Sequence, residues 1–429
     1  MIKPMFVGKS PLETQGIRIL PNVQDKQLLN YFSPVAKLLK AYAVGFSGSS
    51  GVVYSQRTLN VYKMKGEAYD DATVFFNTVF GQLLKKGNWN ELSPSGQESL
   101  LYNVMTELFQ MAINSDIFRQ FWMNDVYKSI VTSGADTGVA DTDYNAYSGI
   151  WKKIFDNSST TPSATQIKRV TISDGAVAGV QTLTQSVDAS GTANVLVDGV
   201  NYLATRDTDA TTTFTNFRTA YSAALLLRGY TLSGTSTLIV TSNVPGRPFN
   251  TITVTTVTGT WMATVATTVS VTAPSALAAA EAADIFDALW TAAPKELKSV
   301  PKNLKALYVG DLVYENYMQW LEDKTGLEST VRMVIDGVEY LAFRGIPIIN
   351  TGWDYHLDAD FAHASGALWA YPHRVIYSAL DNLILGIDGM NDFNSTEIWF
   401  NKDLEQNRMR FKCIMGPEYA HNKLLCVAY

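Results

Sequence analysis

One short segment of the chain gathers side chains that can bind a metal ion. In "DYHLDADFAHASG", Asp354, His356, Asp358, Asp360 and His363 place carboxylates and imidazoles within ten residues. Both groups are ligands of zinc and other transition metals. The competing interpretation is a solvated loop after a strand, since acidic loop residues are common and a metal site also needs a second set of residues to orient its ligands. We predict no metal site here.

Other catalytic patterns are incomplete. The serine-rich "GFSGSSG" lacks the glycine two residues either side of a serine that a nucleophile elbow needs. Gly8-Lys9-Ser10 lacks the earlier glycine and the preceding strand of a phosphate-binding loop. His373 and His421 are predicted to be loop residues without a partner. We therefore expect no catalytic residue, no cofactor and no enzymatic activity.

The composition is that of a folded protein with room for two or three domains. Of 429 residues, 46% are hydrophobic and 17% charged. The formal net charge of −6 and the absence of like-charge blocks argue against a dense basic face for nucleic acid. The opening "MIKPMFVGKS" lacks the apolar core of a signal peptide, and no apolar run reaches the length of a membrane span. A cytosolic site of synthesis fits best.

The two cysteines are too few for a disulfide framework. Cys413 and Cys426 would lie almost opposite each other if "GPEYAHNK" turned one strand back on the next, which would allow a cross-strand disulfide. A reduced, half-buried pair is the expectation for a cytosolic protein.

The first part of the chain predicts an extended arm, a helix, a loop and a long helix. Residues 1–22 have no periodicity, and residues 23–42 carry apolar residues near helical spacing, interrupted at Pro34. A glycine-rich stretch with strand-like alternation follows and predicts a protruding hairpin or long loop. From Ser93, an N-terminal helix signal precedes an apolar face that is formed by Leu101, Val104, Met105, Leu108 and Met111.

Between Lys168 and Lys295 there is no lysine, and Thr, Val, Ser and Ala dominate. Several segments alternate like strands, and residues 211–229 predict one helix with Phe214, Phe217, Tyr221 and Leu225 inward. This shift in composition predicts an inserted small α+β or β-sandwich domain. Its role is either to support the rest of the chain by touching neighbouring elements or to bind a partner, such as a glycan, through exposed loops and edges.

The C-terminal part predicts a helix in residues 274–294, a strand in 304–310, a second helix in 311–326 and then further strands. Within it, "VIDGVEYLAF" predicts a hairpin with a type I′ turn at Asp336-Gly337. A near copy, "LVDGVNYLAT", stands at residues 196–205, but the flanking sequences do not correspond. We interpret the two copies as convergence on one turn, with duplication as the alternative.

The order of elements from Leu289 onward resembles the major capsid proteins of tailed bacteriophages with the Hong Kong 97-type fold. The resemblance is carried by "LWTAAPKELKSVPKNLKALYVGDLVYENYMQWLEDKTG", "YLAFRGIPIINTGWD", "ALDNLILGID", "TEIWFNKD" and "MRFKCIMGPEYAHNKLLCVAY". Gly345-Ile346-Pro347-Ile348 stands where that family has a "G-x-P-I/V" turn, and Asn382-Leu383-Ile384-Leu385-Gly386 stands where it has an "NL-x-x-G" strand. The first half matches by order and length alone.

The resemblance implies an α+β capsid fold divided into four segments. They are an N-terminal arm (1–22), a first core part (23–165) with an extended loop (about 44–90) and a spine helix (about 93–123), an inserted β-rich domain (166–273) and a second core part (274–429). It also implies a subunit that assembles with itself into hexamers and pentamers of an icosahedral head, made in the host cytoplasm and enclosing double-stranded DNA by non-specific contact. Portal, scaffold or decoration proteins are further partners of that class. The alternatives are an encapsulin-like shell and a carbohydrate-binding surface protein led by the inserted domain.

Overall fold

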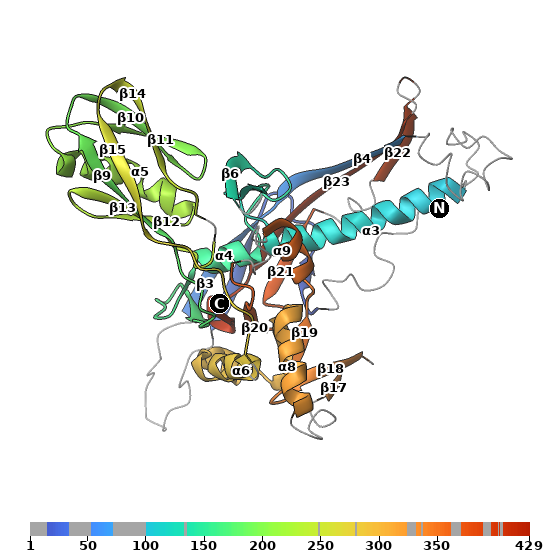
Figure 1. Cartoon of the computed structure of the whole chain (residues 1–429). Helices are drawn as coiled ribbons and strands as arrows, with labels where there is room; N and C mark the ends of the chain where they lie inside the picture. The colour runs from blue at the N-terminus through green and yellow to red at the C-terminus, as the bar shows by residue number, and fades with distance from the viewer. Residues whose placement is uncertain are drawn as a thin grey trace, which may run out of the picture. The chain divides into compact units, whose positions relative to one another are not determined.

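The computed structural model describes residues 15–33, 53–71, 100–132, 135–247, 249–278, 281–323, 332–335, 338–361, 370–388, 396–401, 403 and 406–429. Helices and strands both occur throughout these ranges, so the fold is mixed α+β, as predicted (Figure 1). The chain forms two compact units. The first comprises Met1–Asn124, Ala146–Asp156 and Leu380–Leu424, and the second comprises Asp125–Asn145, Asn157–Ala379 and Leu425–Tyr429.

The first unit contains a five-stranded sheet. Its members are β1 (Arg18–Leu20), β21 (Leu383–Ile387), β23 (Gln406–Tyr419) and β22 (Thr396–Asn401), in this order, with β4 (Tyr62–Asp71) paired to β23 as well. β1 runs parallel to β21, and the other pairs are antiparallel. The end of the predicted arm (1–22) therefore forms β1, a strand of this sheet that pairs with β21.

In the part of this unit that the structure describes, the α-helices are α3 (Leu100–Met123) and α4 (Ile150–Asp156). Phe109, Ile113, Ile117 and Phe121 are buried and spaced by four residues, so they form the covered face of α3. The prediction was wrong for Met111, which is 68% exposed, because two residues of helix turn it away from Phe109. The predicted turns before α3 lie outside the described residues.

A strand replaces the first predicted helix. β2 (Lys26–Ser33) pairs antiparallel with β3 (Val53–Asn60) over eight residues. The apolar spacing near helical period is overridden here because a ladder to distant residues satisfies the backbone of an extended chain. Residues 34–42 of the predicted helix lie outside the described residues.

The hairpin predicted after residue 44 is not formed by residues 53–71. β3 and β4 follow each other directly, but β3 pairs with β2 while β4 pairs with β23. The remainder of the predicted extended loop, to about residue 90, lies outside the described residues, as does "GFSGSSG".

The second unit contains an eight-stranded sheet. In order, its strands are β17 (Arg332–Ile335), β18 (Val338–Phe343), β19 (Ile346–Asn350), β16 (Lys305–Val309), β20 (Val375–Ala379), β24 (Leu425–Ala428), β8 (Ile167–Val170) and β7 (Ser158–Ser159). The central strands β16, β20 and β24 are buried along their whole length. A strand between two helices was predicted for residues 304–310, and β16 confirms it.

A small hairpin and several helices of this unit precede or connect the strands of that sheet along the chain. They are β5 (Ser129–Thr132), β6 (Ala135–Ala140), α6 (Glu281–Ala292), α7 (Lys295–Ser299), the 3-10 helix η2 (Lys302–Leu304), α8 (Asp311–Asp323) and α9 (Asp354–Phe361). α6 and α8 confirm the two helices predicted around β16. No helix in the described ranges has the length and apolar character needed to cross a membrane.

Within the lysine-free segment, the described residues from β9 to β15 form two further sheets and one helix, here called the β9–β15 module. One sheet has the order β11 (Val200–Thr205), β10 (Gly191–Val197), β14 (Thr253–Gly259), and the other has β12 (Tyr230–Ser233), β13 (Thr237–Ser242), β9 (Val180–Val187), β15 (Met262–Val269). The helix is α5 (Ala210–Leu227). β8, by contrast, pairs with β24 and so belongs to the eight-stranded sheet.

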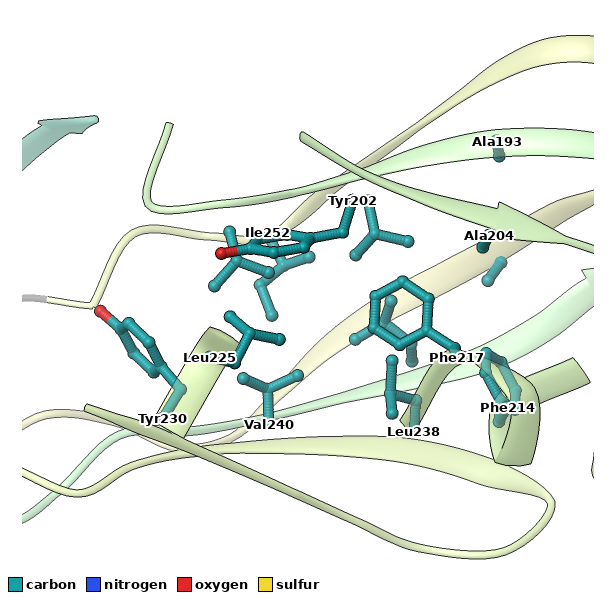
Figure 2. Packing of buried hydrophobic residues seen from close by; sticks show 14 of the residues in the cluster. Ala193, Tyr202, Ala204, Phe214, Phe217, Leu225, Tyr230, Leu238, Val240 and Ile252 are labelled. Atoms are coloured by element: carbon teal, nitrogen blue, oxygen red, sulfur yellow. The ribbon is translucent and has the colours of Figure 1, made fainter. Parts of the chain in front are cut away.

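The β9–β15 module has its own hydrophobic core. Phe214, Phe217 and Leu225 of α5 are buried among residues of both sheets, and Tyr221 packs against the same cluster, as predicted (Figure 2). Asp209 caps the helix, because its carboxylate accepts the backbone N–H of Thr212. The period-2 and helical patterns of the sequence therefore both identify the residues that face this core.

The two "DGV-x-YLA" copies are both antiparallel hairpins, but in different settings. Asp198 and Gly199 join β10 to β11 and both have positive φ angles of 43° and 73°, as a type I′ turn requires. β17 and β18 form the second hairpin, whose turn lies outside the described residues. In the first hairpin the leading strand pairs with a third strand, β14, whereas in the second the trailing strand pairs with β19. This difference favours convergence on one turn.

Candidate functional site

The segment weighed as a metal site is the helix α9, not a loop. Residues two apart in a helix point to opposite sides, so Asp354 and Asp358 share one side while His356 and Asp360 lie on the other. His363 lies outside the described residues. No cluster of three or more His, Cys, Asp or Glu side chains suited to a metal ion occurs in the described ranges.

Asp354 joins α9 to the start of α8. Its buried carboxylate accepts the backbone N–H of Leu312 at 2.9 Å, in the first turn of α8, where the helix dipole favours a negative charge. Burial nevertheless raises the pKa of Asp354 to about 6; Asp311 raises it further, whereas the N–H of Leu312 and the charge of Arg374 lower it. This carboxylate is a structural cap for α8.

Asp360 belongs to a different contact. The hydroxyl of Tyr144 donates to its carboxylate, and the ring of Tyr144 meets that of Phe361 edge-on at 5.3 Å. The Lys128 ammonium lies 4.5 Å from the centre of the Tyr144 ring and 2.5 Å from Asp141. The Asp360 carboxylate is thus held in a network that anchors residues 128–144 of the second unit.

The two remaining histidines lie in loops, as predicted, but each has a hydrogen-bond partner that the sequence did not indicate. His373 is 2% exposed, and its Nε2 lies 2.9 Å from the carbonyl oxygen of Ser275. His421 is also buried, and its Nδ1 accepts the backbone N–H of Lys423 at 3.2 Å. Both partners come from backbone groups whose position depends on the fold.

The two cysteines do not face each other across one hairpin. Cys413 lies in β23 opposite Met64 of β4, in the first unit, whereas Cys426 lies in β24 opposite Tyr377 of β20, in the second. Neither thiol forms a disulfide among the described residues and both are buried, and burial raises the pKa of Cys426 to about 12. The expected cross-strand geometry is wrong because the chain changes sheet between the two residues.

Asn382, the first residue of the "NL-x-x-G" match, fixes the turn that follows β23. Its side-chain amide donates to the carbonyl oxygens of His421 at 3.2 Å and of Leu424 at 3.4 Å. Its Oδ1 accepts the backbone N–H of His421 at 2.9 Å. Because Asn382 is 3% exposed, these bonds satisfy a polar group that would otherwise be costly to bury.

Gly386, the last residue of the same match, lies where strands pass close to one another. It pairs with Gly416 of β23, and the junction between β3 and β4 crosses this pair. A methyl group on Gly386 would lie 2.7 Å from the Leu59 side chain, and one on Gly416 would overlap the carbonyl oxygen of Asn60. Both positions therefore require glycine for steric reasons.

A buried carboxylate near this pair was missed by the sequence analysis. Glu418 accepts from Arg57 of β3 and from Lys153 of α4, each at 2.8 Å, and its side chain is 7% exposed. The Arg57 guanidinium also stacks on the ring of Tyr419 at 3.6 Å. No local signal predicts this network, because its members are 265 and 361 residues apart in the chain.

The first unit also carries large side chains in solvent on its long strands. Leu28 of β2 is 53% exposed, and Tyr62 and Tyr69 of β4 are 42% and 71% exposed. We call β2, β3 and β4 the ribbon surface. β2 and β3 form a sheet of two strands, and such sheets are marginally stable alone. This surface is the candidate functional site of the chain, because it is suited to contact with another chain.

The chain was compared with protein families, curated proteins and solved structures, and matches were found among the solved structures. No family model and no curated protein matches the chain. A chain of the satellite phage P4 procapsid, a structure that includes the size determination (Sid) protein, shares 10% identity with it at a TM-score of 0.43, over 96% of this chain and 85% of that one. The structure of Gordonia phage Cozz shares 10% identity with the chain at a TM-score of 0.39, over 100% of this chain and 89% of that one.

The structures that resemble the chain are mostly phage capsid proteins. They also include an encapsulin complex from Synechococcus elongatus, with 6% identity and a TM-score of 0.39, over 100% of this chain and 90% of that one. All these TM-scores lie below 0.5.

Proposed function

We propose that the chain is the major capsid protein of a tailed phage, with a Hong Kong 97-type fold, and that it builds a closed shell from copies of itself. The ribbon surface is the observation that carries this proposal. Long strands with exposed aromatic and aliphatic side chains gain stability by packing against another molecule. A second copy of the chain is the partner that a repeated, self-closing contact needs.

The motif residues support the same reading. Asn382, Gly386 and Gly416 fix the strands and the turn on which the ribbon surface is built. They stand in the part of the sequence that carries the resemblance to phage capsid proteins. Hexamers and pentamers that enclose double-stranded DNA are the assembly this implies, with many modest contacts acting together.

We further infer that the β9–β15 module is an inserted domain. The support is that its core residues all come from positions 183–263, and that it has two sheets separate from the eight-stranded one. Since β8 pairs with β24, the insertion is best placed after β8, a few residues later than the sequence boundary of 166.

Electron microscopy and sedimentation of the full-length protein test the assembly. We expect closed shells, sheets or rings at high protein concentration and moderate salt. Tyr69→Glu places a charge on the ribbon surface and is expected to abolish these assemblies. Tyr355→Glu is the matched control, since Tyr355 is 74% exposed on α9. A monomer at all concentrations and salts, or equal assembly by Tyr69→Glu, would contradict the proposal.

The content of the shells distinguishes a phage head from an encapsulin-like compartment. Particles recovered from infected cells are expected to contain nuclease-protected double-stranded DNA, held by sequence-independent contacts. Particles that instead enclose a stoichiometric protein cargo would favour an encapsulin-like compartment.

A further inference from the structure

The strands β4 and β23 carry a face of positive charge in the first unit. They lie side by side over ten residue pairs (Figure 1). Side chains of directly paired residues, and of residues two apart along a strand, point to the same side of a sheet. The four pairs from Lys63 opposite Ile414 to Tyr69 opposite Arg408 therefore share one side, which we call the cationic face. Of its eight side chains, five are cationic and one is acidic: Lys63, Lys65, Arg408, Arg410 and Lys412 against Glu67.

The cationic face is turned to solvent, whereas the other side of the same strands is buried. Every β4 residue of the face is exposed, as is Lys412, and Arg408 and Arg410 are half-buried. On the other side, β23 contributes buried side chains to the core: Met409, Phe411, Cys413 and Met415. The charged side is thus the surface that these strands offer to another molecule.

The centre of the cationic face brings like charges together. Lys65 stands directly opposite Lys412, and like charges at opposite positions destabilise a sheet. Glu67 contacts Lys65 at 3.0 Å, but the same carboxylate also contacts Arg410 at 2.9 Å. One carboxylate among five cations leaves an excess of positive charge that a negatively charged partner would offset.

The neighbouring strand β22 indicates which kind of anion suits this face. Its Glu397 lies opposite Arg410, with 3.8 Å between the charged atoms, so Arg410 stands between the carboxylates of Glu67 and Glu397. A continuous row of phosphates would meet these carboxylates as well as the cations, and such like-charge contacts are costly. Separate carboxylates of a protein therefore fit the pattern better than a nucleic-acid backbone does.

The helix α8 of the second unit carries a complementary surface. Its buried residues are spaced by four, which leaves the opposite side of the helix to solvent: Val313, Tyr317 and Leu321. On that opposite side lie four exposed residues, which we call the acidic stripe: Glu315, Gln319, Glu322 and Asp323. The whole of α8 contains four acidic residues and no lysine or arginine, so no cation of the same helix offsets the charge of the stripe.

Two carboxylates of the acidic stripe occupy an unfavourable place. Glu322 and Asp323 lie in the last turn of α8, where the helix dipole favours cations, and that turn has no basic residue. The stripe from Glu315 to Asp323 is about 12 Å long at a rise of about 1.5 Å per residue. Three successive pairs of the cationic face span about 13 Å at about 3.3 Å per residue. The two surfaces therefore match in charge and in length.

We propose that the cationic face of one copy binds the acidic stripe of α8 on a second copy. Because two different surfaces meet, the contact is heterologous, and such contacts generate rings when the rotation between copies closes. Complementary charge selects the partner surface and fixes its register. The inference rests on the proposed self-assembly and names the pair of charged surfaces that directs it.

Two charge-reversed variants of the full-length protein test this contact by sedimentation and electron microscopy. Lys65→Glu/Lys412→Glu reverses the centre of the cationic face, and Glu322→Lys/Asp323→Lys reverses the end of the acidic stripe. Each variant alone should need at least about tenfold more protein to assemble than the parent, because like charges meet at every contact. An equimolar mixture should assemble like the parent, because copies of the two variants that alternate place opposite charges at every contact.

The matched control is Lys295→Glu/Lys298→Glu, which makes the same change in net charge at two exposed positions of α7 and should assemble like the parent. Unchanged circular dichroism of each variant excludes misfolding as the cause of a loss. If either reversed variant assembles alone at the concentration of the parent, or if the mixture stays unassembled, the inference is overturned while the proposed function stands. A parent protein that does not assemble removes both. DNA that the parent retains and Lys65→Glu/Lys412→Glu releases, with assembly unchanged, would assign the cationic face to nucleic acid instead.

Discussion

Replacing Glu418 by Gln tests how the first unit is held together. The carboxylate is 7% exposed and has two cationic partners at 2.8 Å, Arg57 and Lys153. Glutamine keeps the volume and one acceptor oxygen but leaves both cations without a counter-charge. Breaking a buried ion pair by removing one partner costs about 3–5 kcal/mol. Because Arg57 is 29% and Lys153 19% exposed, water screens part of this loss, and we expect the lower end, about 3 kcal/mol.

The assay is amide hydrogen exchange followed by mass spectrometry on the unassembled chain. The loss corresponds to exchange roughly a hundredfold faster in peptides of β3, α4 and the end of β23. Glu67→Gln is the matched control, because Glu67 pairs with Lys65 and Arg410 but is 43% exposed, and such pairs contribute about 0–1 kcal/mol. Equal acceleration in both variants would refute the reasoning that burial makes the Glu418 network important.

Three further predictions concern packing and pH. Gly416→Ala should destabilise the first unit by more than about 3 kcal/mol in urea unfolding because its methyl group would overlap backbone, whereas Gly66→Ala, with open space around it, should be nearly neutral; similar values would contradict the steric argument. Leu238→Ala in the module core should lower the unfolding free energy by about 3 kcal/mol, and Leu226→Ala, at 59% exposure, by less than about 0.5 kcal/mol; a small loss for Leu238 would show that its site collapses. The pKa of Asp354 is raised to about 6, so the folded state holds the proton of this carboxyl to a higher pH than the unfolded chain does. The unfolding free energy of the parent protein, relative to that of Asp354→Asn, should therefore be highest below about pH 4 and fall by about 3 kcal/mol by about pH 6. A difference between the two proteins that does not change with pH, measured by urea unfolding across this range, would disprove the reasoning.

Local periodicity was enough to predict much of the fold. The helix α5 and its inward residues Phe214 and Phe217 were predicted from the sequence, as were α6, β16 and α8. In the helices the apolar spacing matches the helical period, so each helix packs one face on a core, whereas β16 is a short apolar run that is buried along its whole length. The sequence also predicted the Asp198-Gly199 turn between β10 and β11, because few residue pairs accept two positive φ angles.

The sequence could not predict features that depend on distant partners. Residues 26–33 have helical spacing but form β2, because β3 offers a ladder. Residues 354–361 were interpreted as a solvated loop or a cluster of metal ligands, but they form the helix α9, which turns Asp354 and His356 to opposite sides.

By itself, then, the sequence determined the mixed α+β class, most C-terminal elements, the module and the resemblance to phage capsid proteins. Only the tertiary structure decided that Glu418 meets Arg57, that Cys413 and Cys426 lie in different sheets, and that Lys65 lies opposite Lys412 on one charged face. The physical reason is that periodicity reports which face of an element is buried, whereas a network or a charged face is made by residues that the chain brings together from hundreds of positions apart.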